Sequence, residues 1–196
     1  MPEHLHSLFI QTINGQPLYQ LLQLGQLLIE YADIFAKHDL DLGCLDQIEH
    51  SINTGDAPPV KQRMRRTPYN FEAEERKHLQ KMLDAGVICP SDSEWSSAPV
   101  LVRKKDGSVR WCIDFRALND RTIKDVYPLP LIEDCLDALS GTNYLSTLDM
   151  MSGYYQIKLD ESSQKKTAFM TKYGLFHHLR MGFFGYAMHL QLFSVP

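Results

Sequence analysis

The chain has 196 residues, of which 44% are hydrophobic and 22% are charged, a composition typical of one or two globular domains and not of a disordered chain. No apolar run approaches the roughly 20 residues of a membrane span, and the N-terminus MPEHLHSLFI has no basic region ahead of an apolar stretch, which excludes a secretory signal from our expectations. The four cysteines stand more than twenty residues apart and form no C-x-x-C pair. They predict reduced thiols in an intracellular protein, cytoplasmic or nuclear, without structural zinc or a disulfide scaffold.

The net charge of −4 is distributed unevenly along the chain. Residues 1–59 carry one Lys or Arg against eight Asp or Glu, residues 60–130 carry fourteen against ten, and residues 131–196 carry five against six. A net basic segment within an acidic chain is where a polyanion such as nucleic acid docks. The alternative interpretation is an ordinary solvated face.

Two helices are predicted in the first half of the chain. Residues 17–37 place apolar side chains at near-helical spacing, which predicts the first helix. From residue 39 to 59 this pattern dissolves, which indicates an extended connector. The second helix is predicted over residues 71–85, with Asn70 as its N-cap and Gly86 directly after its end.

The second half of the chain mixes strands with a helix. Residues 99–114 predict a β-hairpin, because two β-prone runs flank Asp106 and Gly107, a dipeptide that tolerates a tight turn. A short helix is predicted over residues 131–139, and strands are predicted in YLSTLD and in residues 166–181. Helices interspersed with hairpins indicate an α+β fold.

Three cations surround the turn of the predicted hairpin. Lys104 and Lys105 stand just before this turn and Arg110 just after it, so a two-stranded ribbon can aim them at one point. Such a cluster suits a triphosphate, which needs charge neutralisation and several donors at once. The alternative interpretation is a solvated turn.

Asp149 ends the β-prone run YLSTLD, where a strand would hold its carboxylate at the end of a sheet. Mg²⁺ takes oxygen ligands, commonly one or two carboxylates together with substrate phosphates. The alternative is that Asp149 is the N-cap of the turn that begins at Met150.

Two further signals stand near the end of the chain. Tyr154 follows Gly153, where the absence of a side chain permits a ligand to approach the backbone; the alternative for Tyr154 is packing in the core. His177 and His178 are adjacent, and on a strand they would point to opposite faces, which argues against a shared metal ion.

Four segments together resemble the first part of the reverse transcriptase of gypsy-type LTR retrotransposons. They are HSINTGDAPPVKQRMRR, MLDAGVICPSDSEWSSAPVLVRKKDGSVRWCIDFRALN, YPLPLIEDCLDALSG and YLSTLDMMSGYYQIKLDESSQKKTAF. The resemblance extends from about Tyr31 to Met181, roughly three quarters of the chain. It implies a right-hand polymerase fold of the α+β class, with fingers and an incomplete palm, that binds an RNA or DNA template-primer, dNTP and Mg²⁺.

The resemblance also implies roles for residues that contact the nucleotide. Lys104 and Arg110 match the fingers residues that grip the incoming triphosphate. Ser152 and Gly153 match positions near the pocket of the 3′-hydroxyl, and Tyr154 matches the residue that excludes a 2′-hydroxyl.

Metal and template roles follow in the same way. Asp149 matches the first catalytic carboxylate, and the backbone carbonyl of Met150 matches the adjoining metal ligand. Arg116 and Asn119 match residues on the template side.

The activity implied by the resemblance is two-metal phosphoryl transfer, which requires carboxylates that bridge both ions. The family supplies them from the position of Asp149 and from a later Tyr-x-Asp-Asp hairpin. After Asp149 the only acidic residues of this chain are Asp160 and Glu161. We therefore expect an RNA-directed DNA polymerase fragment that is inactive alone; the alternatives are a non-catalytic nucleic-acid-binding remnant or a pseudogene product without a role.

The end of the chain departs from the family pattern, which continues after Arg-Met as Pro-Phe-Gly-Leu-Cys-Asn-Ala-Pro-Ala-Thr-Phe-Gln. With suitable codons for residues 185–194 (GYAMHLQLFS), a shifted reading frame spells Leu-Cys-Asn-Ala-Pro-Ala-Thr-Phe-Gln. We expect an out-of-frame tail, with missense decay or an error in the gene prediction as alternatives.

We expect the chain to consist of four parts. They are an N-terminal helix and linker (1–60), a fingers subdomain (61–130), a partial palm (131–182) and the aberrant tail (183–196). An incomplete palm would expose a sheet edge, and we expect association through that edge.

Overall fold

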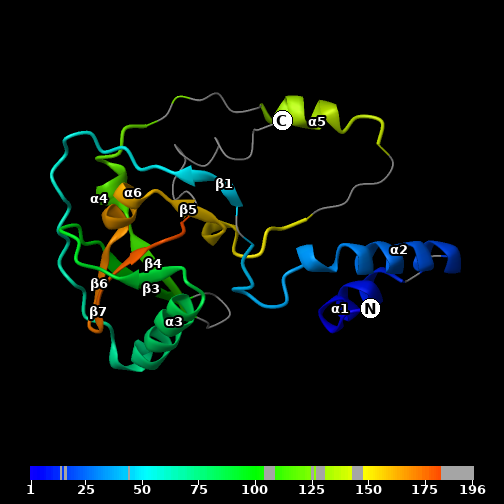
Figure 1. Ribbon diagram of the computed structural model, residues 1–196, viewed down its shortest axis with the longest axis horizontal. Helices are drawn as coiled ribbons and strands as arrows, with labels where there is room; N and C mark the ends of the chain where they lie inside the picture. The colour runs from blue at the N-terminus through cyan, green and yellow to red at the C-terminus, as the bar shows by residue number, and fades with distance from the viewer. Residues whose placement is uncertain are drawn as a thin grey trace.

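The computed structural model of the chain describes residues 1–13, 15, 17–43, 45–103, 109–124, 126, 131–142 and 148–181. At residues 46, 102, 109 and 110 it describes the backbone alone. The strands gather in one part of the molecule, and α1 and α2 lie beside that part (Figure 1). Within the described ranges, no helix is both long and apolar enough to cross a membrane. The expected out-of-frame tail lies outside these ranges.

The N-terminal helices form a pair. Helix α1 spans Glu3–Thr12 and was not predicted, and α2 spans Leu18–Glu30 directly after Pro17. The helix predicted to reach residue 37 therefore ends earlier, because Tyr31 leaves the helical region (φ −103°, ψ 25°) and a 3₁₀ turn, η1 (Ala32–Ile34), follows.

Helix α3 (Glu72–Asp84) confirms the predicted helix and is one residue shorter at each end. Gly86 adopts φ +63°, and its N–H donates to Leu83 O while that of Val87 donates to Met82 O. These two bonds form a Schellman motif, which closes the helix. The predicted N-cap is wrong: Asn70 lies inside a 3₁₀ turn, η2 (Tyr69–Phe71), and no side chain caps α3.

The strands of the described residues form three small sheets. An antiparallel hairpin joins β3 to β4, a three-stranded antiparallel sheet has the order β2-β7-β6, and β1 pairs in parallel with β5. The strands are β1 (Leu45–His50), β2 (Ile88–Pro90), β3 (Ala98–Arg103), β4 (Val109–Asp114), β5 (Ile157–Leu159), β6 (Phe169–Thr171) and β7 (Gly174–His178). The predicted hairpin and the strands predicted in residues 166–181 are confirmed. Strand β1 lies within the segment from residue 39 to 59 that was expected to be an extended connector.

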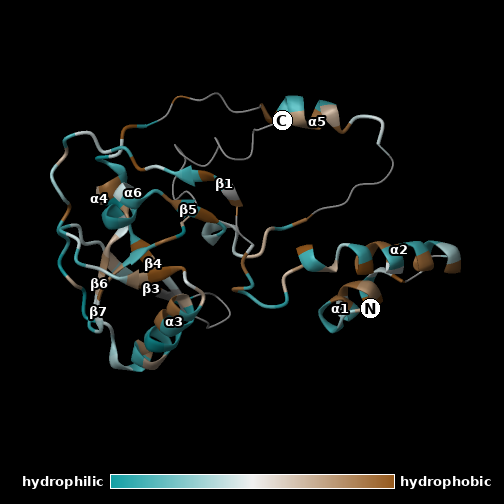
Figure 2. Ribbon diagram, viewed as in Figure 1, coloured by the Kyte–Doolittle hydropathy of each residue, from teal (hydrophilic) through white to brown (hydrophobic). Residues whose placement is uncertain are grey.

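Short helices complete the described fold. They are α4 (Arg116–Asn119), α5 (Ile132–Ala138), α6 (Glu161–Gln164), η3 (Gly153–Tyr155) and η4 (Lys165–Thr167). Helix α5 confirms the prediction over residues 131–139. Apolar side chains remain exposed on α2 and α5, whose ribbons carry brown stretches in Figure 2.

Two clusters of buried side chains hold the strands and α3 together. One contains Met82, Val87 and Phe169, and the other contains Phe115 and Leu159. Their remaining buried members are Leu79, Ile88 and Phe176 in the first, and Ile52, Leu118 and Met181 in the second. Both clusters include buried residues before and after residue 130, and the second also includes Ile52, which precedes residue 60. The subdomain boundaries set at 60 and 130 stay predictions.

Candidate active site

The hairpin brings the expected triphosphate-binding segment to the end of two paired strands. Arg103 is opposite Val109 in the register, and Arg110 is opposite Val102. Lys104 lies outside the described residues, as does the side chain of Arg110. Their convergence on one ligand therefore stays a prediction.

Asp149 lies in an exposed segment without regular structure, next to Leu148, which is 86% exposed. Residues 143–147 are outside the described part, but Leu148 and Asp149 do not belong to a strand. The expectation that a strand ends at Asp149 is therefore wrong for these two residues. The N-cap alternative also fails, because the N-cap position of η3 is Ser152 and no side chain caps that turn.

A tight turn follows Asp149. The carbonyl of Met150 accepts a hydrogen bond from the N–H of Gly153 (3.2 Å), and Tyr155 N–H donates to Ser152 O (2.8 Å). Ser152 adopts the left-handed conformation (φ +47°), which is strained for a residue with a side chain. Its hydroxyl donates to the carbonyl of Asp39 (2.6 Å). The N-terminal connector thus helps to hold the turn.

Gly153 and Tyr154 occupy different environments within this turn. A Cβ added at Gly153 would lie 3.2 Å from the Cβ of Met150, so the turn itself favours glycine there. Tyr154 is 46% exposed, which rules out the core-packing alternative. The core residue is instead Tyr155, whose ring stacks with that of His178 at a centroid distance of 6.3 Å.

Further contacts join the connector to the segment after the turn. Leu45 N–H donates to Gln156 O (3.0 Å), and the guanidinium of Arg180 donates to Gly43 O (3.3 Å). The parallel pair β1–β5 extends this contact. Sequence reasoning missed this arrangement because no local pattern marks a pairing between segments more than a hundred residues apart.

Arg116 is held by a carboxylate two residues before it. Its Nε and Nη2 donate to Oδ1 and Oδ2 of Asp114 at 2.9 and 2.7 Å, a bidentate geometry that fixes a guanidinium plane. Arg65 also approaches Asp114 Oδ2 at 3.7 Å. The hydrogen bonds from Arg116 lower the pKa of Asp114 to about 2 despite partial desolvation. Sequence reasoning found Arg116 but missed Asp114 and Arg65.

Asn119 ends α4 beside a small cavity of about 20 Å³, which is enough for one water molecule. Its lining residues are His50, Ile52, Phe115, Leu118, Asn119, Thr122 and Met181. Burial lowers the pKa of His50 to about 4, with Asp160 opposing the shift. The structure places Asn119 and Arg116 on one short helix.

The donor set at the turn fits a hard cation only in part. Asp149 offers an exposed carboxylate and Met150 a backbone carbonyl, both oxygen donors of the kind that Mg²⁺ takes. In the described part of the chain, no group of three or more His, Cys, Asp or Glu side chains could hold a metal ion. One carboxylate does not suffice for two bridged ions.

The fold is similar to that of solved reverse transcriptases. A prototype foamy virus protease–reverse transcriptase (CSH mutant) superposes with a TM-score of 0.79 at 23% identity, over 91% of this chain and 24% of the viral one. The same viral protein solved in complex with an RNA/DNA hybrid superposes with a TM-score of 0.72 at 23% identity, over 85% and 22% of the two chains. The molecule therefore has the fold of a reverse transcriptase polymerase.

Sequence comparison defines the family. Residues 102–188 match the family described as reverse transcriptase (RNA-dependent DNA polymerase). The Pol polyprotein of Drosophila melanogaster transposon 412 is 34% identical over 82% of this chain, and that of transposon gypsy is 35% identical over 68%. The chain spans 14% and 13% of those two polyproteins. It belongs to the reverse transcriptases of gypsy-type retrotransposon Pol polyproteins, as a fragment of such an RNA-directed DNA polymerase.

Proposed function

We propose that this fragment forms the fingers and the first-carboxylate part of a polymerase that copies RNA or DNA, and that it binds a primer–template. The related viral reverse transcriptase has been solved with an RNA/DNA hybrid, which supports nucleic acid as the partner. We also propose that the fragment acts inside the cell.

The observation that carries this proposal is the convergence of Arg65 and Arg116 on Asp114. These guanidiniums come from segments fifty-one positions apart, and their side chains are 59% and 82% exposed. Gln62 fixes the first segment, because its amide donates to Asp114 O (3.2 Å) and accepts from Ala98 N–H (2.9 Å). Exposed Arg63 and Arg66 belong to the same segment. Cationic side chains that are held in place on one surface are what binding of a nucleic-acid phosphate backbone requires.

The nucleotide end of the proposal rests on family positions and on the turn after Asp149. Lys104 and Arg110 would bind the triphosphate, while Ser152, Gly153 and Tyr154 would line the pocket for the sugar. The exposed Tyr154 and the held conformation of Ser152 support this assignment.

The metal in this proposal is Mg²⁺, held by the carboxylate of Asp149 and the carbonyl of Met150. When bound, Mg²⁺ neutralises charge on a triphosphate. These 196 residues contain no Tyr-x-Asp-Asp, so we propose that the chain alone binds nucleic acid without extending a primer.

Fluorescence anisotropy with a labelled RNA/DNA hybrid tests the binding function. Affinity should fall steeply with salt, and Arg65→Gln/Arg116→Gln should reduce the slope of log K against log [salt] by about 1.4 to 1.8, since each phosphate contact contributes about 0.7 to 0.9. Glutamine keeps a donor for Asp114. The matched control Lys37→Ala/Lys77→Ala removes two exposed lysines and should leave the slope unchanged. Binding that is indifferent to salt and to both arginines would reject the proposal.

Primer extension tests the catalytic limit. No extension is expected with Mg²⁺ and dNTP from the chain alone. Extension that Asp149→Asn abolishes would refute the predicted inactivity while supporting the assigned role of Asp149.

A further inference from the structure

Cys89 and His177 form a cross-strand pair that the polymerase function does not use. They are register partners between β2, at an edge of its sheet, and β7. Both side chains are partly exposed, whereas Ile88, Phe176 and His178 are buried. Because side chains alternate along a strand, Cys89 and His177 share the face opposite to the core. The two histidines therefore point apart, as the sequence predicted, and His177 meets a thiol instead.

The contacts of this pair define a relay of three side chains. Cys89 Sγ lies 3.1 Å from His177 Nε2, and His177 Nδ1 lies 2.9 Å from Ser91 Oγ. Sulfur is a weak acceptor and an imidazole nitrogen a good one, so we assign the thiol as donor to Nε2 and the Nδ1–H as donor to the serine oxygen. Ser91 Oγ also accepts from Ser93 N–H (3.2 Å), which fixes its position. Cys89, His177 and Ser91 are thus connected as a nucleophile, a base and a group that orients the base.

Burial favours the neutral, basic form of the imidazole. Burial lowers the pKa of His177, with Asp92 opposing and Lys165 adding to the shift. These two groups form an ion pair at 3.2 Å and face His177 from the segment after β2 and from η4. Burial also raises the pKa of the Cys89 thiol, so this thiol stays protonated and needs a neighbouring base to react near neutral pH.

We propose that Cys89 is a modification site: a nucleophilic thiol, assisted by His177 as general base and oriented by Ser91, that reacts with small electrophiles. With iodoacetamide, the Sγ–carbon bond forms as the carbon–iodine bond breaks. Iodide leaves with the bonding pair, and the thiol proton passes to Nε2 and then to solvent. General-base assistance of this kind contributes typically 10²- to 10⁴-fold in enzymes, and a partly exposed pair should retain at least about tenfold.

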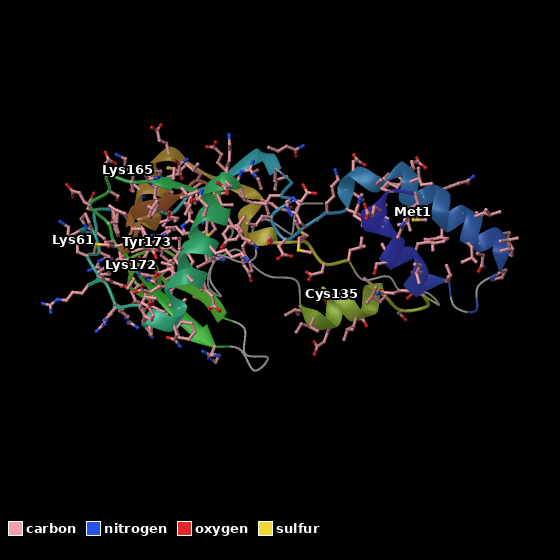
Figure 3. The ribbon with its side chains drawn as sticks, turned by 90° about the horizontal axis from the view of Figure 1, so that it is seen from below. Met1, Lys61, Cys135, Lys165, Lys172 and Tyr173 are labelled. Atoms are coloured by element: carbon pink, nitrogen blue, oxygen red, sulfur yellow. The ribbon has the colours of Figure 1, made fainter. Side chains whose placement is uncertain are left out.

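Peptide mass spectrometry of the full chain during iodoacetamide treatment tests the proposal. Cys135 is exposed on α5 and lies away from Lys165 (Figure 3), which makes it an internal reference. His177→Gln should slow the alkylation of Cys89 about tenfold or more and leave Cys135 unchanged. In the native chain the rate should follow the titration of the imidazole; in His177→Gln it should rise only as the thiol ionises above about pH 8.5.

The opposite result would overturn the proposal. If the hydrogen bond merely shields the thiol, His177→Gln leaves the rate at Cys89 unchanged or raises it. Unfolding of the variant would also raise the alkylation rate of the partly buried Cys112. An unchanged alkylation rate at Cys112 therefore shows that the variant is folded. Ser91→Ala gives a second variant that keeps both reacting groups. This variant should slow the alkylation of Cys89 severalfold. An alkylation rate equal to that of the native chain would reject the orienting role of Ser91.

Discussion

Asp160 helps to join α6 to the segment that contains His50 and Ile52. It is the N-cap of α6, where Oδ1 accepts from Ser163 N–H (2.9 Å) and Oδ2 from the Ser163 hydroxyl (2.6 Å). That hydroxyl accepts from Ile52 N–H (2.7 Å), and Asp160 N–H donates to His50 O (3.1 Å). Burial raises the pKa of Asp160, but hydrogen bonds, led by the one from Ser162, outweigh it and lower the value to about 2.

Substitution of Asp160 should therefore have a pH-dependent cost. The Asp160 carboxyl has a pKa of 3.8 in the unfolded state and of about 2 in the native state. As the pH falls, the unfolded state therefore takes up the proton before the native state does. The carboxylate stabilises the fold above pH 4, and this stabilisation is lost as the pH falls towards 2. Asp160→Asn keeps a capping group but removes the charge, and Asp160→Ala should lower the free energy of unfolding at pH 7 by about 1 kcal/mol.

Urea unfolding at pH 7, 4 and 2.5 measures both effects. The difference between the native chain and Asp160→Asn should shrink as the pH falls. Asp137→Asn, at an exposed carboxyl on α5, is the matched control and should show no such trend. A difference that stays constant from pH 7 to 2.5 contradicts the role of the charge.

At the scale of elements, the end of α3 depends on one backbone conformation. A Cβ at Gly86 would meet no atom within 4 Å, so Gly86→Ala would cost only the left-handed backbone, about 1 kcal/mol. Gly25 lies inside α2, where a Cβ would touch Phe9 at an ordinary 3.8 Å. Gly25→Ala should therefore stabilise its helix by about 0.5 to 1 kcal/mol. Thermal unfolding followed by circular dichroism should show shifts of opposite sign; equal signs would contradict this account.

The elements that the sequence predicted are those whose signals are local. Helix α3, the β3–β4 hairpin and α5 each follow from spacing and turn residues within their own span. The strand β1 and its parallel partner β5 were missed, because that pairing joins Leu45 to Ile157 and no pattern near either residue reveals it. The residues of the candidate site show the same difference between local and long-range signals. Motifs identified Arg116 and Ser152, whereas their partners Arg65 and Asp39 became visible only through the fold.

At the scale of the whole molecule, the N-terminal helices and the polymerase-like part differ in how they are held. Neither buried cluster contains a residue of α1 or α2 among the described residues. Their buried side chains are Leu5 and Leu28, and His4 Nε2 of α1 contacts Ala32 O, in the turn after α2, at 3.2 Å. Figure 3 places Met1 at the opposite end of the molecule from Lys61 and Lys172. The connector after Lys37, by contrast, contacts the turn that follows Asp149.

Deletion of residues 1–36 should consequently leave the rest folded, with a free energy of unfolding within about 1 kcal/mol of the full chain, because it removes neither cluster. It should also reduce self-association, since α2 leaves Leu18 73% and Leu22 62% exposed. Deletion of residues 1–50 removes β1, the Asp39 carbonyl that accepts from Ser152, and the His50 carbonyl that accepts from Asp160. That variant should expose the edge of β5, lose cooperative unfolding and aggregate.

Urea unfolding with analytical ultracentrifugation distinguishes these outcomes. Loss of cooperativity already in the shorter deletion would show that α1 and α2 support the core. Self-association that persists after the shorter deletion would instead locate the contact on the strand-bearing part, as the expected exposed palm edge requires. Self-association that disappears would assign it to the apolar side chains of α1 and α2, because the shorter deletion leaves every strand in place.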